Sequence, residues 1–389
     1  MNYILFDDQK VREELLPLTF TRPVADLRFG ISTMREKWER ILGEKTSTLT
    51  EKYLSRKFPL IKKEDNNILI NSSVCPNEAL LKQIQALKPD QALVGEVKVI
   101  AMNLSLDNLE NMEVSDSSQV SLEATTVCIN NVWDLFSKLD VTIKRDFDFI
   151  TKGRKSQEIS KSNHIIGDYP IFLEEGAKVE FAYLNATDGP IYLGKNSEVM
   201  EAAVIRGPFS LGESSLVRPL TKIFGATSVG PFSKVGGEIS NSLIHGYSNK
   251  VHDGFMGNSI VGEWCNLGAG TNTSNLKNTY DNVRIWSYGQ ETFTDTGLQF
   301  CGLIMGDHSK TSINTMLNTG TVVGVSSNLF GSGFPRQFVH SFMWGGFNGL
   351  RKYNLKKAIQ VAEIVYARRG LEFDKVEKDI FDEIFHMTI

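Results

Sequence analysis

The chain has 389 residues, of which 41% are hydrophobic and 23% are charged, a composition typical of soluble globular proteins with two or three domains. Its formal net charge of −4 argues against non-specific binding of nucleic acid, which requires a basic surface. The first ten residues carry acids where a secretory signal would be basic, and no apolar run of about 18 residues follows. The four cysteines are widely spaced, so we expect reduced thiols in a cytoplasmic protein with no membrane partner.

Residues 1–150 alternate short apolar runs with helical patterns. The runs YILF, NILINS and ALVG are typical of buried parallel strands, and ISTMREKWERIL and PNEALLKQIQAL have the spacing of amphipathic helices. This alternation predicts an α/β domain. The polar and charged residues that follow predict a linker over 151–165.

A six-residue period begins at Leu193. Every sixth residue is aliphatic over eight positions, and the set four residues later is almost entirely small. These sets are Leu193, Val199, Ile205, Leu211, Val217, Ile223, Val229 and Val235, and Ser197, Ala203, Phe209, Ser215, Thr221, Thr227 and Ser233. The period suits a triangular solenoid in which each hexad forms one short strand and one corner, with coils stacked about 4.8 Å apart. We therefore predict a left-handed parallel β-helix (the hexapeptide-repeat type) over 166–335.

The period is interrupted twice. After Val235 it is expected to return in the inward-facing positions Leu243, Asn249, Phe255, Val261 and Leu267. The second break, over residues 272–301, is either a loop that leaves the coil or an ordinary bulge. Residues 336–389 contain amphipathic patterns, which predict a helical tail packed on the solenoid end or on a neighbouring subunit.

Three features of the repeat region occur at defined spacings. The segment CNLGAGTNTSNL contains a GAGT turn, and His252 lies sixteen residues before its first glycine. Arg218-Pro219 lies eleven residues before Val229-Gly230. Together these spacings resemble the bifunctional N-acetylglucosamine-1-phosphate uridyltransferase / glucosamine-1-phosphate acetyltransferase family and related sugar-1-phosphate nucleotidyltransferases with β-helical tails. The resemblance implies a homotrimer with active sites between subunits and a small sugar phosphate as substrate.

The same resemblance implies roles for individual side chains. His252 would be the general base that takes a proton from the substrate amine as its nitrogen attacks the thioester of acetyl-CoA. Arg218 would bind the sugar phosphate. Asn266 and Asn275 occupy the substrate-binding positions. The residues of the turn that would bind acetyl-CoA through backbone N–H groups are Gly268, Ala269 and Gly270.

Other interpretations of these residues stay open. His252 and Arg218 could be surface residues on a solenoid corner, and Asn266 could belong to an asparagine ladder. Lys250 and Lys277 could help to bind phosphate, but solvated side chains are expected for both. Phe255 replaces the family's sugar-binding tyrosine, so the amino sugar could differ.

The N-terminal stretch LLPLTFTRPVADL resembles the segment after the glycine-rich loop of sugar nucleotidyltransferases. The loop itself reads FDDQKVREE, with Glu14 at the position of the catalytic arginine, and Asn71-Ser72-Ser73 replaces the motif whose aspartate holds Mg²⁺. Because phosphoryl transfer depends on metal and cations, two alternatives follow. The domain has become a binding or scaffold module, or it binds NTP and Mg²⁺ through a rebuilt site formed by Asp7, Asp8, Arg12 and Arg22.

Three functions therefore remain. The first is a sugar-nucleotide biosynthesis enzyme that transfers acetyl from acetyl-CoA to an amino-sugar 1-phosphate in the β-helix, with an associated nucleotidyltransferase-like domain. The second is a sugar-1-phosphate nucleotidyltransferase whose β-helix only trimerises. The third is a non-catalytic trimer that binds sugar nucleotides.

Overall fold

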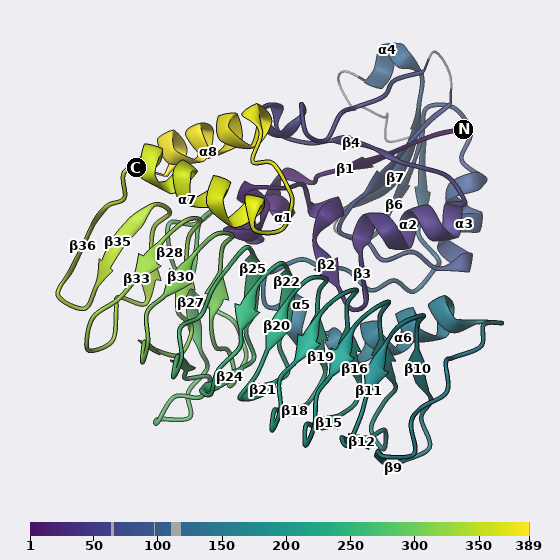
Figure 1. The fold of residues 1–389 in the computed structure, drawn as a ribbon. Coiled ribbons are helices and arrows are strands. Elements are labelled where there is room, and N and C mark those ends of the chain that lie inside the picture. The colour runs from purple at the N-terminus through teal and green to yellow at the C-terminus, as the bar shows by residue number, and fades with distance from the viewer. Residues whose placement is uncertain (64–65, 97, 110–117, 389) are drawn as a thin grey trace. The chain divides into compact units, whose positions relative to one another are not determined.

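The structure is a computed structural model that describes residues 1–63, 66–96, 98–109 and 118–388 (Figure 1). The chain divides into two compact units. The first consists of Met1–Leu15, Thr21–Leu27 and Ser32–Asn131, and the second of Leu16–Phe20, Arg28–Ile31 and the chain from Val132 on.

The first unit is built on a mixed sheet with the strand order β4-β1-β5-β7-β6-β8. The strands are β1 (Asn2–Phe6), β4 (Ser47–Leu49), β5 (Asn67–Asn71), β6 (Gln91–Val94), β7 (Val99–Leu104) and β8 (Gln119–Ser121). β1 pairs in parallel with β4 and β5, and β7 is antiparallel to both β5 and β6. The three predicted strands are therefore confirmed and point the same way, although an antiparallel strand separates the last two.

The helices of the first unit follow their capping residues. α2 (Met34–Leu42) begins at a capping box formed by Thr33 and Glu36 and ends at Gly43, whose φ is 71°. α3 (Glu78–Gln85) begins where Asn77 accepts the N–H of Leu80. The predicted helices are thus confirmed. The remaining short elements are α1 (Gln9–Glu14), η2 (Val24–Asp26), β3 (Ser32–Thr33), η3 (Lys52–Leu54) and α4 (Leu106–Leu109).

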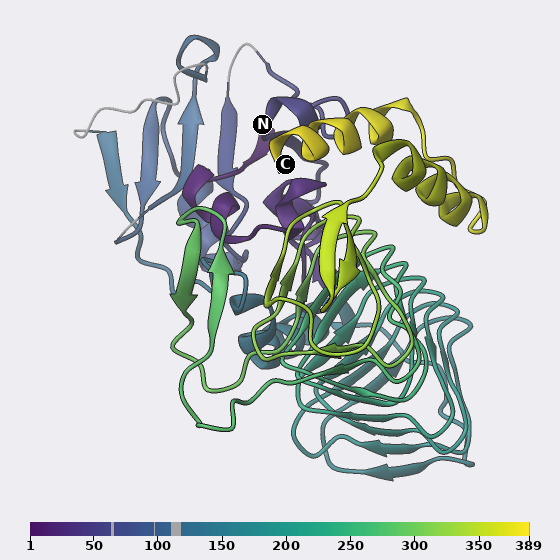
Figure 2. The ribbon, with the colours of Figure 1, turned by 90° about the vertical axis from the view of Figure 1, so that its left-hand side faces the viewer.

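The second unit contains the predicted parallel β-helix, which has three sheets along its length (Figures 1 and 2). The first solenoid sheet contains β10 (Ile171–Leu173), β13 (Ile191–Leu193), β16 (Phe209–Leu211), β19 (Thr227–Val229), β22 (Leu243–Gly246), β25 (Ile260–Glu263), β29 (Ile304–Met305), β32 (Val322–Val323) and β34 (Phe338–Val339). The second contains β11 (Lys178–Val179), β14 (Glu198–Val199), β17 (Leu216–Val217), β20 (Lys234–Val235) and β23 (Asn249–Lys250), and bridges through Asn266 extend it to β30 (Lys310–Thr311), β33 (Asn328–Leu329), β35 (Met343–Gly346) and β36 (Gly349–Lys352).

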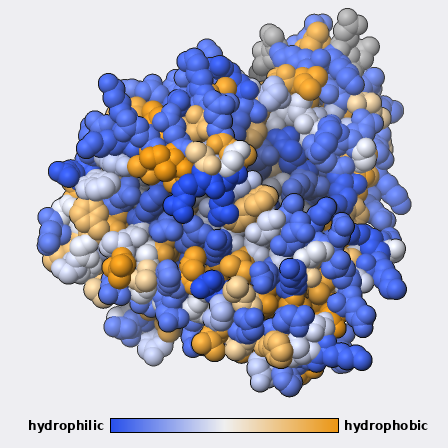
Figure 3. Space-filling model, viewed as in Figure 1, coloured by the Kyte–Doolittle hydropathy of each residue, from blue (hydrophilic) through white to orange (hydrophobic). Residues whose placement is uncertain are grey.

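The third solenoid sheet contains β9 (His164–Ile166), β12 (Tyr183–Asn185), β15 (Val204–Arg206), β18 (Lys222–Phe224), β21 (Glu238–Ser240) and β24 (Phe255–Gly257), and β26 (Asn272–Thr273) pairs with β31 (Met316–Leu317) in later coils. Corner I leads from the first sheet to the second, corner II from the second to the third, and corner III from the third back to the first. On the face drawn in Figure 3, apolar patches alternate with polar ones along the coils.

Both predicted residue sets face the interior. All eight aliphatic residues from Leu193 to Val235 are buried in one hydrophobic cluster. The small residues link successive coils: the Ser215 hydroxyl donates to the Gly230 carbonyl at 2.8 Å and accepts the Ser233 N–H at 3.0 Å. The six-residue period therefore records both the packing and the hydrogen bonding of the coils.

The predicted return of the period is wrong by one residue in its first three positions. Ile244 pairs with Val229, Lys250 with Val235, and Met256 with Ile239, so these three face inward in place of Leu243, Asn249 and Phe255. The cause is a shortened coil. Val235 and Ile239 occupy equivalent positions in neighbouring sheets but lie only four residues apart.

The break over residues 272–301 is a loop that leaves the coil. It carries an antiparallel hairpin of β27 (Arg284–Ser287) and β28 (Thr292–Asp295), which stands away from the stacked coils in Figure 2. Trp286 of the hairpin stacks on Phe338 of a later coil, with ring centroids 4.4 Å apart. Of the two alternatives, the loop is therefore correct.

The tail forms the predicted helices α7 (Leu355–Ala367) and α8 (Lys375–Met387). They pack on corner I, where aromatic rings stack from coil to coil. The ring centroid of Tyr247 lies 4.9 Å from that of Phe232 and 4.2 Å from that of Trp264. Tyr366 of α7 stacks on Trp264 with ring centroids 4.0 Å apart. The second unit also contains η1 (Leu18–Phe20), β2 (Arg28–Phe29), α5 (Asp134–Ser137) and α6 (Leu139–Thr151). Among the described residues, no helix combines the length and apolar character needed to cross a membrane.

Candidate functional site

His252 lies on corner II, in the turn between β23 and β24, and is exposed to solvent. Its backbone carbonyl accepts a hydrogen bond from the Lys250 ammonium. The carbonyl of the next residue, Asp253, accepts the N–H of Gly270 from the following coil at 3.0 Å. The turn is therefore held by the interior of the solenoid and by the adjacent coil, while the residue that bears the imidazole remains accessible.

Arg218 lies on the same corner, two coils before His252. Val217 pairs with Val235, which in turn pairs with Lys250, so the two coil levels lie about 10 Å apart at the usual strand spacing. The residue between them is Gly236. A Cβ built there would lie 1.9 Å from the Val251 carbonyl oxygen and 3.3 Å from Cβ of Arg218. The structure thus places both predicted residues on one corner, with a glycine between their levels.

The Gly-Ala-Gly turn belongs to the next coil on corner II, but most of its N–H groups are already engaged. Gly268 donates to the carbonyl and the hydroxyl of Thr311 at 3.1 and 3.0 Å, and Gly270 donates to Asp253. These two N–H groups are therefore not available to the thioester, contrary to the expectation for the turn. Within the described part of the chain, the N–H of Ala269 has no acceptor, which makes Ala269 the donor of interest.

The two predicted asparagines lie at different corners. Asn266 is exposed on the second sheet, next to Asn249 of the preceding coil. Asn275 lies beyond β26 on corner III, where its side-chain amide donates to Asn258 Oδ1 at 2.8 Å. Within one chain, Asn275 is therefore not on the His252 corner. The side chains of Asn258 and Asn275 thus form a hydrogen-bonded pair between two coils at corner III.

Lys250 is a residue of the candidate site whose structural position the sequence did not predict. It is only 2% exposed, so the expectation of a solvated side chain is wrong. It occupies the inward position filled by Val235 one coil earlier, and burial lowers the pKa of its ammonium to about 8. Lys250 is thus a buried charged residue that lies only two positions before His252, the predicted base.

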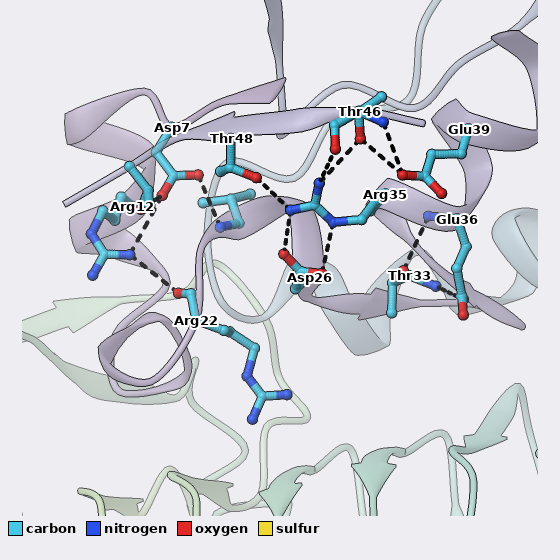
Figure 4. A network of polar contacts seen from close by, with 12 residues as sticks. Asp7, Arg12, Arg22, Asp26, Thr33, Arg35, Glu36, Glu39, Thr46 and Thr48 are labelled. Atoms are coloured by element: carbon cyan, nitrogen blue, oxygen red, sulfur yellow. Dashed lines mark hydrogen bonds and ion pairs between the residues drawn. The ribbon is translucent and has the colours of Figure 1, made fainter. Parts of the chain in front are cut away.

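The candidate residues of the first unit form an internal network (Figure 4). Asp7 follows β1 directly, accepts the Val24 N–H at 2.9 Å and the Thr50 hydroxyl at 2.6 Å, and lies 3.6 Å from Arg12. Arg12 donates to Tyr53 Oη at 2.8 Å and to the Arg22 carbonyl at 3.3 Å. Asp7 and Arg12 are thus brought together, and their hydrogen bonds hold the surrounding loops.

The other two candidates of this group do not join Asp7 and Arg12. Asp8 caps the six-residue helix α1 by accepting the Val11 N–H at 3.1 Å. The guanidinium of Arg22 points away from Asp7 and Arg12 in Figure 4, and the carbonyl of Arg22 is the group that Arg12 contacts. The four predicted residues therefore do not converge on one nucleotide site.

Burial of Asp7 makes stability depend on pH. Burial raises the pKa of its carboxyl to about 6, although the Arg12 charge acts in the opposite direction. The native state therefore retains a proton that the unfolded chain loses between pH ~4 and 6, so stability should fall as pH rises through this window, by roughly 3 kcal/mol. In urea unfolding at pH 4 and 6.5, Asp7→Asn should show a correspondingly smaller decrease. Asp8→Asn, which retains the helix cap, is the control, and equal decreases in Asp7→Asn and the wild type would refute the prediction.

The end of β5 does not fit the Mg²⁺ implied by the nucleotidyltransferase resemblance. Asn71 and Ser73 bond to each other at 2.7 Å, and the Lys98 ammonium donates to Ser73 Oγ at 2.9 Å and to Asn130 Oδ1 at 2.8 Å. The Lys98 ammonium therefore already occupies the end of β5, where the resembled family has the carboxylate that holds Mg²⁺. No cluster of three metal-binding side chains occurs in the described ranges.

Comparison with known proteins places the N-terminal part of the chain. Residues 3–155 match the family model described as sugar nucleotidyl transferase. This stretch is similar to sugar nucleotidyl transferases. Curated relatives include the Bifunctional protein GlmU of Methanococcus aeolicus, 34% identical over 28% of this chain and 25% of that protein.

Other relatives show a similar level of likeness. The Bifunctional sugar-1-phosphate nucleotidylyltransferase/acetyltransferase of Sulfurisphaera tokodaii is 27% identical over 31% of this chain and 28% of that protein. The chain therefore matches about a quarter of the length of these relatives. Over that part, the predicted resemblance to the bifunctional family is confirmed. Among solved structures, the UDP-N-acetylglucosamine acyltransferase of Arabidopsis is 12% identical, with a TM-score of 0.32 over 55% of this chain and 80% of that chain.

Proposed function

We propose that the chain transfers the acetyl group of acetyl-CoA to the amine of an amino-sugar 1-phosphate, as a step of sugar-nucleotide biosynthesis in the cytoplasm. The observation that carries the proposal is the arrangement on corner II. Arg218, His252 and Ala269 all lie on this corner. The Gly236 coil separates the coil of Arg218 from that of His252, and Ala269 belongs to the coil that follows His252. A phosphate-binding cation, a base and an N–H donor are thus arranged along one line.

The chemistry assigns one role to each group. The neutral imidazole of His252 accepts a proton from the substrate amine as the nitrogen forms a bond to the thioester carbonyl carbon. The negative charge that develops on the carbonyl oxygen is stabilised by the Ala269 N–H. The carbon–sulfur bond then breaks, and the proton on His252 passes to the departing thiolate. Arg218 binds the 1-phosphate through its planar guanidinium and so orients the amine.

A homotrimer would complete this site with residues from a second subunit. The third solenoid sheet supports such packing because apolar side chains lie exposed along it. Tyr183, Val204 and Phe224 are 48%, 45% and 42% exposed and come from the adjacent strands β12, β15 and β18. Asn275 is on corner III of its own chain, so it would reach an acetyl-transfer site only from a neighbouring copy.

Nucleotidyl transfer by the first unit is the second candidate function, and the family match over residues 3–155 favours it. The internal bonding of Asp7 and Arg12 and the position of Lys98 favour a domain that binds a sugar nucleotide without turnover. The two alternatives predict different results with NTP and Mg²⁺, because only nucleotidyl transfer releases pyrophosphate.

The deciding experiment measures thiol release from acetyl-CoA by the wild-type protein with glucosamine-1-phosphate and other amino-sugar phosphates. Release with at least one of these amines, and none with the corresponding sugar phosphates that lack the amine, is expected. A silent panel would refute acetyl transfer to an amino-sugar phosphate. Pyrophosphate release from NTP and a sugar 1-phosphate, measured in parallel, would establish the second candidate.

A further inference from the structure

A lysine occupies an aliphatic position inside the solenoid. The inward column of the second sheet contains Val199, Val217 and Val235 in consecutive coils, and Lys250 comes next. Lys250 is among the largest fully buried side chains of the described residues. Since a buried ammonium is costly unless its donors are satisfied, an aliphatic residue at this position would pack more favourably. The lysine therefore needs a purpose other than filling the core.

The ammonium of Lys250 connects two coils at corner II. It donates to the Gly236 carbonyl at 3.1 Å and to the His252 carbonyl. Gly236 belongs to the shortened coil, whose corner contains two consecutive glycines and offers no side chain to support the next turn. Asp253 is the charged residue whose field favours the protonated form of Lys250. One hydrogen bond thus holds the backbone of the turn that presents His252, and the other ties it to the backbone of the preceding Gly236 coil.

We propose that Lys250 is a positioning residue for His252, acting from inside the solenoid. Its hydrogen bonds fix the backbone of the turn against the Gly236 coil and thereby fix the direction of the imidazole. The catalytic consequence rests on the proposed acetyl transfer, but the structural effect on the His252 turn can be measured without turnover. Because a displacement of about 1 Å can cost on the order of 10²-fold in rate, even a small relaxation of this turn would be detectable.

Lys310 provides a matched control. It is partly buried on the second solenoid sheet, burial lowers the pKa of its ammonium, and it donates to the backbone carbonyl of His308 at 2.8 Å. His308, however, is packed among the aromatic rings of corner I, where it stacks on Tyr366. The substitution Lys310→Met therefore also removes a hydrogen bond from a lysine to a backbone carbonyl, but it does so at corner I and not at corner II.

The kinetic test compares Lys250→Met with Lys310→Met, each confirmed as folded by thermal melting. For acetyl transfer, Lys250→Met should lower kcat by about 10–100-fold and leave KM for acetyl-CoA nearly unchanged, whereas Lys310→Met should stay within about twofold of the wild type. Lys250→Gln, which retains N–H donors, should recover part of the lost kcat and also serves if the methionine variant does not fold. A folded Lys250→Met with wild-type kcat would overturn the proposal.

A second measurement separates failure of this proposal from failure of the proposed function. In protein labelled with ¹⁵N-histidine, Lys250→Met should shift the His252 signals and accelerate exchange of the His252 amide hydrogen, and Lys310→Met should leave both unchanged. His252 signals identical in Lys250→Met and the wild type would refute the positioning role even in an active enzyme. Altered signals in a protein that releases no thiol would support the positioning role and refute acetyl transfer alone.

Discussion

Replacing His252 by alanine should lower kcat for acetyl transfer by about 10²–10⁴-fold, the usual contribution of a general base. KM for acetyl-CoA should change little, because the imidazole acts on the amine and not on the bound thioester. The residue is exposed on a corner, so its removal should leave the melting temperature within a few degrees of the wild-type value. The measurement is steady-state thiol release at saturating acetyl-CoA.

His386→Ala is the control for this substitution. His386 lies exposed on α8, 3.7 Å from Asp382, and has no part in the proposed chemistry, so its replacement should preserve kcat. If His252→Ala retained wild-type kcat, another group would have to accept the proton, and the assignment of the base on corner II would be wrong.

Replacing Gly236 by alanine should destabilise the second unit by about 3–5 kcal/mol, within the range of the most severe single substitutions. The added Cβ would lie 1.9 Å from the Val251 oxygen and 2.8 Å from the Val251 carbonyl carbon. These are backbone atoms of the adjacent coil, so no side-chain rotation relieves the overlap. The coil that moves carries His252, and activity should fall together with stability.

Urea unfolding measures this effect, with Gly297→Ala as the control. Gly297 has a φ of 68°, and among the described residues no atom outside its two chain neighbours lies within 4 Å of the position that an added Cβ would take, so its replacement should cost only about 1 kcal/mol. Equal unfolding midpoints for the two variants would contradict the close approach of coils at Gly236.

The solenoid was predictable because its packing repeats along the chain. From Leu193 to Val235 each hexad places one aliphatic residue inside, and the pattern can be read without knowledge of any contact. The shortened coil after Val235 breaks this rule, since Ile239 follows after four residues. A register that restarts at Leu243 and continues by six assigns Asn249 to the interior and Lys250 to the surface, which is why the sequence did not predict the buried lysine.

The candidate site was predictable to the level of the coil but not of each bond. The family resemblance groups Arg218 and His252 in one site, and the structure places both on corner II. The Thr311 groups that engage the Gly268 N–H come from beyond the 272–301 loop, and the sequence does not show which coil follows such an excursion. For the same reason the partners of Asp7 could not be foreseen, because Val24 and Thr50 reach it from separate loops.

The last coil of the solenoid departs from the parallel order of the others, since β36 turns back and pairs antiparallel with β35. A stack of parallel strands ends in an open row of N–H and C=O groups, on which a second molecule could continue the stack and so begin a fibre. Here the outermost strand runs against the direction of the stack and carries Arg351 and Lys352, both exposed. Reversed polarity and like charge at this edge disfavour end-to-end polymerisation of a protein whose coils are otherwise built to add to one another.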